Sequence, residues 1–387
     1  MLPTSWFKNA VFYHILIDRF AGCTSFKNKP DFQGGNIRGI IEKLDYIEGL
    51  DVNAIWLSPF YETREYHGYH ITNFREVDPH FGNIDDLKRL IQEAHKRNLK
   101  VIADFVPNHC SVYHPWFVEA QNNSDSRYRQ WFCFTKWPKE YLSFLDYKIL
   151  PKINLDYPEA REYMIETAKY WLLFGLDGFR IDHIIGPSHD FNKAFYWSIK
   201  KDYPEAVLFG EAWANGTKWH DYKTISIKHK FLRKLFGISQ EKIQLEYRNE
   251  TDGILDFKLN YLLLEAIRKP DSISENSKLK RKVQKHLKKY SSDFITVAFL
   301  DNHDVNRFLY YCGGDTDRML QALEFLLSLN IPLAIYYGTE QGMYNKEPLS
   351  HKIPYADLVV RELLDWESMD MELYMRIRDL ILDYRKR

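Results

Sequence analysis

Short apolar runs recur along the whole chain and alternate with longer stretches in which apolar residues follow helical spacing. The stretch 84–98, for example, predicts an amphipathic helix whose buried face holds Leu87, Leu90, Ile91 and Ala94. Strands that alternate with helices pair in parallel. The runs expected to be buried strands are 10–18, 53–59, 100–106, 178–182, 206–213, 253–257, 294–300 and 333–337. Eight such runs predict an α/β fold, the (β/α)8 or TIM barrel.

This alternation is interrupted once, after the third predicted strand. The next helix is expected to begin near residue 158, and the residues before it are rich in Trp, Tyr, Pro and Asn. Loops of this length in a compact domain usually carry function. We therefore expect residues 107–156 to form a small inserted subdomain, subdomain B, that covers the cleft. Residues 1–106 and 157–387 are expected to form the barrel.

Three carboxylates stand where predicted strands end. They are Asp182, Glu211 and Asp304, and each closes a short apolar run. In a parallel barrel the chemistry takes place at the carboxyl ends of the strands. Acids from different strands are therefore expected to converge on one pocket, a pattern typical of sugar-cleaving barrels.

Composition and charge fit a neutral partner. The chain has 53 basic and 53 acidic residues, so no long-range field favours nucleic acid or an anionic membrane. The Lys-rich stretch 278–289 is expected to be the solvated surface of a helix. Aromatic residues make up 16% of the chain, and flat rings suit the faces of pyranose sugars, although most are expected to pack in the core.

The cysteines and the termini predict a cytoplasmic protein. Cys23, Cys110, Cys133 and Cys312 form no CxxC pair, which argues against a zinc site or a disulfide framework. The N-terminal residues 1–8 lack the apolar core of a signal peptide. No run of about 18 apolar residues predicts a spanning helix. Reduced thiols in a reducing compartment are the simplest interpretation.

Four segments resemble, in order, the signature regions of the α-amylase superfamily of glycoside hydrolases. They are DFVPNH at 104–109, GFRIDH at 178–183, GEAW at 210–213 and FLDNHD at 299–304. The segments 34–36 and 337–342 match as well, so the resemblance covers nearly the whole chain. It implies a retaining hydrolase of α-1,4 glucosidic bonds, with α-1,6 bonds as a further target.

The chemistry of such a reaction can be assigned to two of the acids. Retaining hydrolysis needs a nucleophilic carboxylate and a carboxyl group that acts first as acid and then as base, ~5–5.5 Å apart. Asp182 suits the nucleophile, because Arg180 lies two residues earlier on the same strand face and would keep it ionised. Glu211 suits the acid and base, because its apolar neighbours would raise the pKa of a carboxyl group. A structural salt bridge is the alternative for Asp182.

Asp304 has two interpretations. Taken alone, it is equally consistent with the N-cap of a helix that begins in the segment 305–308. The resemblance implies instead that it holds sugar hydroxyls and supports an oxocarbenium-like transition state. Asp104 and Asn108 are expected to brace the site, with Asp104 paired to Arg180.

The resemblance also implies a set of residues that bind the sugar. His109 and His303 are expected to form hydrogen bonds with hydroxyls of the sugar being cleaved, and Tyr69 is expected to stack under it. The predicted substrate-binding residues are Tyr69, His109, Arg180, His183, Trp213 and His303.

One motif departs from the pattern of many α-amylases. Lys152, in the segment 150–154, stands where they carry an Asp that contributes to a calcium site, and a cation there would repel calcium. We therefore expect no required cofactor and predict no metal ligand, although the resemblance itself leaves room for calcium. The Pro-Lys-x-Asn pattern is similar to neopullulanases, cyclomaltodextrinases and maltogenic amylases. The residues at 301–302 and 106–107 look more like ordinary α-amylases or α-glucosidases.

Three functions remain open. The first is a hydrolase of maltooligosaccharides, cyclodextrins, pullulan or soluble starch. The chain stops after a helix at 371–386, where relatives continue into a β-sandwich, so granular starch is expected to be a poor substrate and a homo-oligomer would cover exposed apolar surface. The second is an α-glucan transglycosylase, in which another sugar replaces water. The third is a non-catalytic carbohydrate-binding scaffold.

Overall fold

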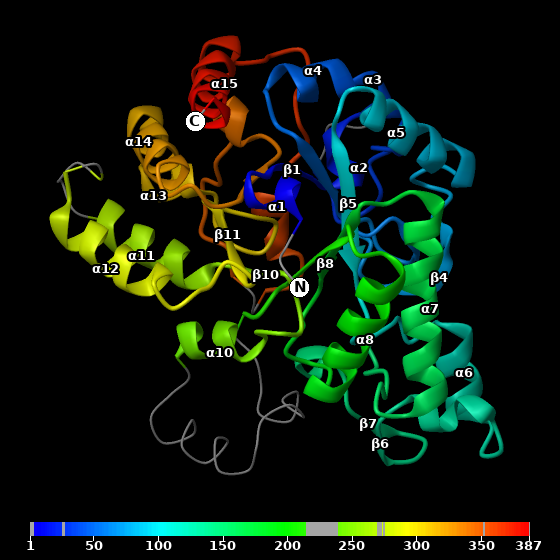
Figure 1. Ribbon diagram of the computed structural model, residues 1–387. Helices are drawn as coiled ribbons and strands as arrows, with labels where there is room; N and C mark the ends of the chain where they lie inside the picture. The colour runs from blue at the N-terminus through cyan, green and yellow to red at the C-terminus, as the bar shows by residue number, and fades with distance from the viewer. Residues whose placement is uncertain are drawn as a thin grey trace. The chain divides into compact units, whose positions relative to one another are not determined.

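The protein contains a closed barrel of eight parallel strands (Figure 1). The computed structural model describes residues 4–24, 28–213, 239–268, 273, 275–350 and 353–386. In barrel order the strands are β1 (Val11–Ile15), β2 (Ala54–Leu57), β5 (Lys100–Phe105), β8 (Gly178–Ile181), β9 (Val207–Gly210), β10 (Gly253–Leu255), β11 (Ile295–Phe299) and β12 (Leu333–Tyr336). Each lies inside one of the predicted runs, so the predicted (β/α)8 fold is confirmed.

Burial explains why these strands could be recognised. Every residue of β1, β2, β8, β9 and β12 is buried. Strands of a parallel barrel are covered on both faces, so they appear in the sequence as continuous apolar runs rather than as alternating ones. The few polar residues inside them, such as His14 in β1 and Arg180 in β8, are therefore conspicuous.

The chain divides into two compact units. Unit 1 comprises Met1–Ser58, Pro79–Ile102 and Leu255–Arg387, and unit 2 comprises Pro59–Asp78 and Ala103–Ile254. Unit 1 holds β1, β2, β11 and β12, while unit 2 holds β8 and β9.

Unit 1 contains most of the barrel helices. The predicted helix 84–98 is α5, which begins with a capping box between Asn83 and Asp86 and buries the predicted apolar face. Lys278, Lys280 and Arg281 on α12 are exposed, as predicted for this basic stretch. The helices are α1 (Ser5–Lys8), α2 (Ile17–Phe20), α3 (Ile37–Glu42), α4 (Leu44–Gly49), α5 (Ile84–Lys96), α11 (Phe257–Ile267), α12 (Ser277–Leu287), α13 (Phe308–Tyr311), α14 (Thr316–Leu327) and α15 (Met371–Arg385), with short 3-10 turns η4 (Thr339–Gln341) and η5 (Ala356–Val360).

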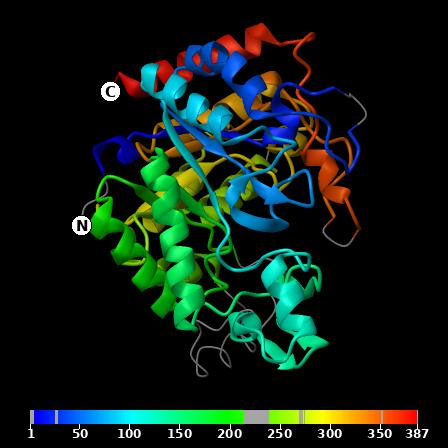
Figure 2. The same cartoon turned by 90° about the vertical axis from the view of Figure 1, so that its right-hand side faces the viewer.

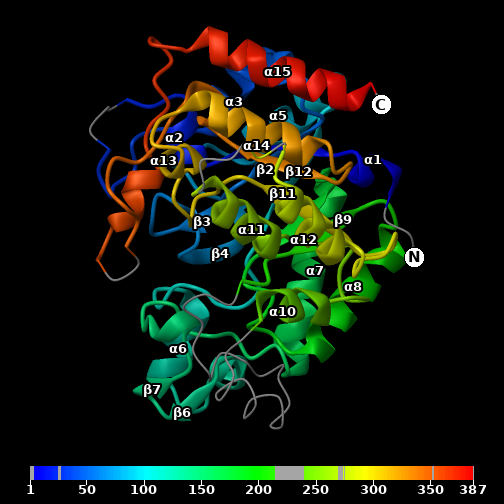
Figure 3. The same cartoon turned by 90° about the vertical axis from the view of Figure 1, so that its left-hand side faces the viewer.

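Unit 2 combines two long helices with small elements. The helices α7 (Pro158–Phe174) and α8 (His189–Asp202) pack side by side (Figure 2, green). The smaller elements are β3 (Tyr61–Thr63), β4 (Ile71–Val77), α6 (Pro115–Asn122), η1 (Arg127–Trp131), β6 (Phe134–Lys136), β7 (Glu140–Tyr141), η2 (Phe144–Asp146) and α10 (Gln240–Glu246). The elements from α6 to η2 all come from the stretch 107–156, and Figure 3 shows α6, β6 and β7 gathered together.

None of the four cysteines, all of which lie in the described ranges, forms a disulfide. In the described part of the chain, no helix has both the length and the apolar character needed to cross a membrane.

Candidate active site

Two of the predicted acids follow neighbouring strands of unit 2. Asp182 comes directly after β8 and Glu211 directly after β9. The two strands pair in parallel with Ile181 opposite Gly210, so the acids leave the sheet at the same level. Each of the two residues is only 6% exposed. The strand register therefore brings the two carboxylates to one place, as the sequence predicted.

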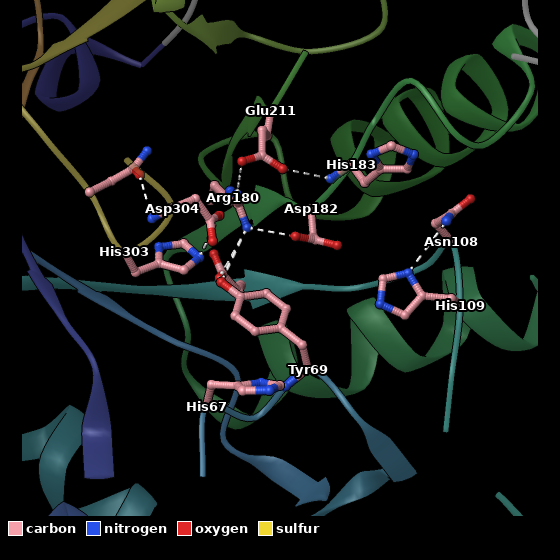
Figure 4. A network of polar contacts seen from close by, with 12 residues as sticks. His67, Tyr69, Asn108, His109, Arg180, Asp182, His183, Glu211, His303 and Asp304 are labelled. Carbon is pink, nitrogen blue, oxygen red and sulfur yellow. Dashed lines mark hydrogen bonds and ion pairs between the residues drawn. The ribbon is translucent and has the colours of Figure 1, made fainter. Parts of the chain in front are cut away.

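Arg180 is the centre of this arrangement (Figure 4). Its Nη1 lies 3.1 Å from Asp104 Oδ2 and 2.9 Å from Asp182 Oδ1, and its Nη2 lies 2.5 Å from Glu211 Oε1. The predicted pairing of Arg180 with Asp104 is confirmed. Burial alone would lower the pKa of Arg180, but the carboxylates of Asp104 and Glu211 outweigh it and raise this pKa well above its ordinary value. We call Tyr69, Asp104, Arg180, Asp182 and Glu211 the Arg180 network.

The surroundings of Glu211 differ from those predicted. The apolar residues before it are buried in β9, but its own carboxylate contacts polar partners. Oε1 faces the guanidinium of Arg180, and Oε2 accepts a hydrogen bond from the backbone N–H of His183 at 3.2 Å. The sequence predicted that the apolar neighbours of Glu211 would raise the pKa of its carboxyl group, but in the structure the groups that contact this carboxylate are the Arg180 guanidinium and the His183 backbone N–H.

Tyr69 belongs to the same network. Its hydroxyl donates a hydrogen bond to Asp104 Oδ2, and its backbone N–H donates to His67 Nδ1 at 3.1 Å. Gly68 has a φ of +87°, and a Cβ there would lie 2.1 Å from the carbonyl oxygen of Pro59. The loop that presents Tyr69 therefore requires glycine at this position, a requirement that the sequence analysis did not identify.

Burial favours the neutral form of two histidines of unit 2 that were predicted to bind the sugar. Burial lowers the pKa of His109 to about 3 and that of His183 well below its ordinary value. His183 follows Asp182 with a φ of +43°, an uncommon conformation for a non-glycine residue. Neutral imidazoles can donate or accept hydrogen bonds with sugar hydroxyls without carrying a charge.

Phe144 is a site residue that the sequence analysis missed. It begins η2 inside the stretch 107–156, and its ring centroid lies 4.7 Å from those of both His109 and His183. The next residue, Leu145, has a φ of +47°. Only the wealth of aromatic residues in this stretch could have suggested such a contact.

Lys152 is buried and bonded to a residue of the first signature region. Its Nζ donates to Asn108 Oδ1 at 2.9 Å and also to the backbone carbonyl of Gly186. The side chain is 2% exposed. The positively charged Lys152 ammonium thus takes the place next to the Asn108 oxygen in which a calcium ion would have to bind. The residues present therefore do not fit a calcium ion there. Within the described ranges, no group of three or more His, Cys, Asp or Glu side chains could hold a metal.

Asp304 and His303 lie in unit 1, in a second group of polar residues (Figure 4). Asp304 Oδ2 lies 3.0 Å from His303 Nε2, and Asp304 Oδ1 accepts from Arg361 Nη2 at 2.9 Å. The backbone N–H of Asp304 donates to Asn302 Oδ1 at 2.9 Å. We call Asn302, His303, Asp304 and Arg361 the Asp304 cluster.

The alternative interpretation of Asp304 as a helix cap is wrong. Helix α13 begins at Phe308, and the backbone N–H of Phe308 donates to Asp301 Oδ2 at 2.6 Å. Asp301 thus accepts the hydrogen bond from the first backbone N–H of the helix, and the Asp304 carboxylate contacts other side chains instead.

The remaining predicted substrate-binding residue is Trp213. It follows Glu211 by two residues and is partly exposed.

Known proteins resemble this chain along most of its length. Alpha-amylase 2 of Dictyoglomus thermophilum is 37% identical over 343 residues, 87% of this chain and 56% of the relative. A cyclomaltodextrinase of a Bacillus species is 30% identical over 366 residues, 88% of this chain and 60% of the relative. The chain therefore spans less than two thirds of the length of these curated relatives.

A solved structure is similar to this chain in fold. Cyclic alpha-maltosyl-(1→6)-maltose hydrolase from Arthrobacter globiformis, in complex with that cyclic sugar, superposes with a TM-score of 0.82 at 25% identity, over 99% of this chain and 84% of the other. The family profile described as alpha amylase, catalytic domain, matches residues 15–373, a range that includes every candidate site residue. The chain belongs to the alpha-amylase family.

Proposed function

We propose that the chain is a retaining glycoside hydrolase that cleaves α-glucosidic bonds of α-glucans. The observation that carries this proposal is the Arg180 network, in which one buried guanidinium contacts both Asp182 and Glu211 at the ends of adjacent barrel strands. A pair of carboxyl groups is the requirement of retaining hydrolysis. The names of the relatives, amylases and hydrolases of cyclic α-glucans, support the same reaction class.

In the first step, Asp182 attacks the anomeric carbon of the sugar as a carboxylate. The bond to the leaving oxygen breaks, and that oxygen takes a proton from the Glu211 carboxyl group. The product is a glycosyl ester on Asp182. Glu211 then removes a proton from water, whose oxygen attacks the anomeric carbon and releases Asp182. Arg180 Nη1, 2.9 Å from Asp182 Oδ1, favours the ionised nucleophile throughout.

The proton on Glu211 can be argued from the charge balance of the network. Asp104, Asp182 and Glu211 all lie within 3.1 Å of a single guanidinium. Three carboxylates so close to one cation repel each other, and this repulsion favours a proton on one of them. We assign this proton to Glu211, because the reaction needs an acid that is not the nucleophile. Asp304 is assigned the third role, support of the oxocarbenium-like transition state, from the resemblance.

The substrates proposed are soluble maltooligosaccharides, cyclodextrins and pullulan. Two of the relatives named above act, by their names, on cyclic maltose-based sugars, and the Pro-Lys-x-Asn pattern around Lys152 fits the same group. We further propose that no calcium is required, because the Lys152 ammonium bonds the Asn108 oxygen. Four cysteines without a disulfide support a cytoplasmic location.

A product profile tests the proposed function. The protein would be incubated with pullulan, β-cyclodextrin and soluble starch, and products separated by chromatography, with Asp182→Asn as the blank. Panose or maltose from pullulan, with the cyclodextrin opened faster than starch, is the expected result. In a separate incubation of labelled maltose with maltotriose, the formation of longer oligosaccharides would favour the transglycosylase. No change in any α-glucan would contradict the proposal.

A further inference from the structure

The Asp304 cluster contains a cation from a distant part of the chain. Arg361 lies 57 residues after Asp304 and directly follows η5. Its Nη2 donates to Asp304 Oδ1 at 2.9 Å, and its Nε donates to the backbone carbonyl of His303 at 2.9 Å. Arg361 is 6% exposed, which is rare for an arginine unless it is paired. This arginine is thus built into the cluster and is not a surface side chain that happens to touch it.

These contacts restrict the Asp304 carboxylate. Arg361 holds Oδ1, while His303 Nε2 lies 3.0 Å from Oδ2. Arg361 also donates to the backbone carbonyl of His303. One guanidinium therefore holds both the Asp304 carboxylate and the backbone of the preceding residue. The planar fork of an arginine has its donors at set angles, so it restrains orientation more strongly than a point charge does.

A second ion pair restrains the arginine itself. Arg361 Nη1 lies 2.5 Å from Oδ2 of Asp357, a residue of η5 four positions earlier in the chain. The orientation of Asp304 is thereby tied to the segment that carries Arg361. The Asp304 side chain nevertheless stays 25% exposed, so part of the carboxylate can meet a ligand.

We propose that Arg361 is a positioning residue that fixes the orientation of the Asp304 carboxylate and acts on the reaction through it. This inference rests on the proposed function, because the orientation of Asp304 matters only if Asp304 takes part in the reaction. An oriented carboxylate stabilises positive charge that develops in the transition state more than it stabilises the bound substrate. Loss of Arg361 should therefore lower kcat and leave KM nearly unchanged.

A double-mutant cycle tests the inference. Arg361→Gln, Asp304→Asn and the double variant would be compared with the wild type on 4-nitrophenyl maltoside, whose activated leaving group keeps slow variants measurable. We expect Arg361→Gln to lower kcat about 100-fold in the wild type and less than about threefold in the Asp304→Asn background. Arg376→Gln is the matched control, since Arg376 forms an exposed ion pair with Asp317 and should keep full activity.

Two further readouts separate positioning from a structural role. Arg361→Lys keeps the charge but not the fork, and should lie between Arg361→Gln and the wild type. It also replaces Arg361→Gln in the cycle if the latter does not fold. Added guanidinium ion should restore part of the activity of Arg361→Ala.

Equal losses from Arg361→Gln in both backgrounds would overturn the inference, because they would mean that Arg361 does not act through Asp304. Activity of Arg361→Gln within twofold of the wild type would also overturn it, provided that Asp182→Asn is inactive. An active Asp182→Asn would instead contradict the proposed function, and the inference would fail with it.

Discussion

The Arg180 network of unit 2 and the Asp304 cluster of unit 1 each join a buried arginine to carboxylates, but the chain builds them differently. Arg180 and Asp182 are two residues apart on one strand, and Glu211 follows the next strand of the barrel. Asp304 receives its arginine from a segment 57 residues later. Strand geometry thus supplies the first arrangement, whereas loop folding supplies the second.

The two regions also differ in burial. The Arg180 side chain is 0% exposed and contacts three carboxylates, while the Asp304 side chain is 25% exposed. Water can screen a charge that becomes unpaired at Asp304, but it cannot do so around Arg180. Equivalent changes should therefore have larger effects in the network than in the cluster.

The largest expected effect is the loss of an acid from the network. Asp182→Asn should lower kcat on maltotriose roughly 10⁴-fold or more, because the covalent intermediate can no longer form. Asp304→Asn should cost about 10²–10³-fold, the range for one electrostatic contact with the transition state. Steady-state kinetics would check both, with the exposed Asp202→Asn as control. Equal losses of kcat at Asp182 and Asp304 would contradict the statement that changes in the Arg180 network have larger effects than changes in the Asp304 cluster.

The second effect is on stability. Arg180→Gln should lower the free energy of unfolding by about 3–5 kcal/mol, because it leaves buried carboxylates without their cation. Arg361→Gln should cost less, since Asp304 keeps access to water. Urea denaturation followed by circular dichroism would measure both variants. A larger loss at Arg361 than at Arg180 would refute the argument from burial.

A smaller effect is expected at Lys152, which is also in unit 2 and bonds Asn108. Lys152→Met removes the donor to Asn108 Oδ1 and to the carbonyl of Gly186, and should lower the free energy of unfolding by about 1–3 kcal/mol. A chelator should leave wild-type activity unchanged. Thermal unfolding and an assay with and without chelator would test the two statements. A loss of activity that calcium reverses would contradict the assignment.

The effect that is smallest near neutral pH, and that grows only as the pH falls, concerns His109. The pKa of His109 falls from about 6.5 in the unfolded chain to about 3 in the folded protein. Below pH 6.5 the unfolded chain therefore binds a proton that the folded protein does not bind, so stability decreases as pH falls toward 3. His109→Gln should reduce the slope of the unfolding free energy against pH in this window by about one proton. Identical slopes would show that His109 is not buried in the neutral form.

The sequence predicted the network better than the cluster for a physical reason. Buried parallel strands appear as apolar runs, so the positions of Arg180 and Asp182 followed from strand spacing alone. Which of Asp301 and Asp304 satisfies the start of α13 depends on the path of a loop. The contacts of Arg361 and Phe144 depend on segments that fold against distant residues, and no local pattern encodes such contacts.

The most direct test of the central claim is the stereochemistry of azide products. Asp182→Ala and Glu211→Ala would each be incubated with α-maltosyl fluoride and sodium azide, and the products identified by NMR. If Asp182 is the nucleophile, azide replaces it in Asp182→Ala and gives β-maltosyl azide. In Glu211→Ala the glycosyl ester still forms, and azide opens it to α-maltosyl azide. The opposite assignment, or the same anomer from both variants, would contradict the account.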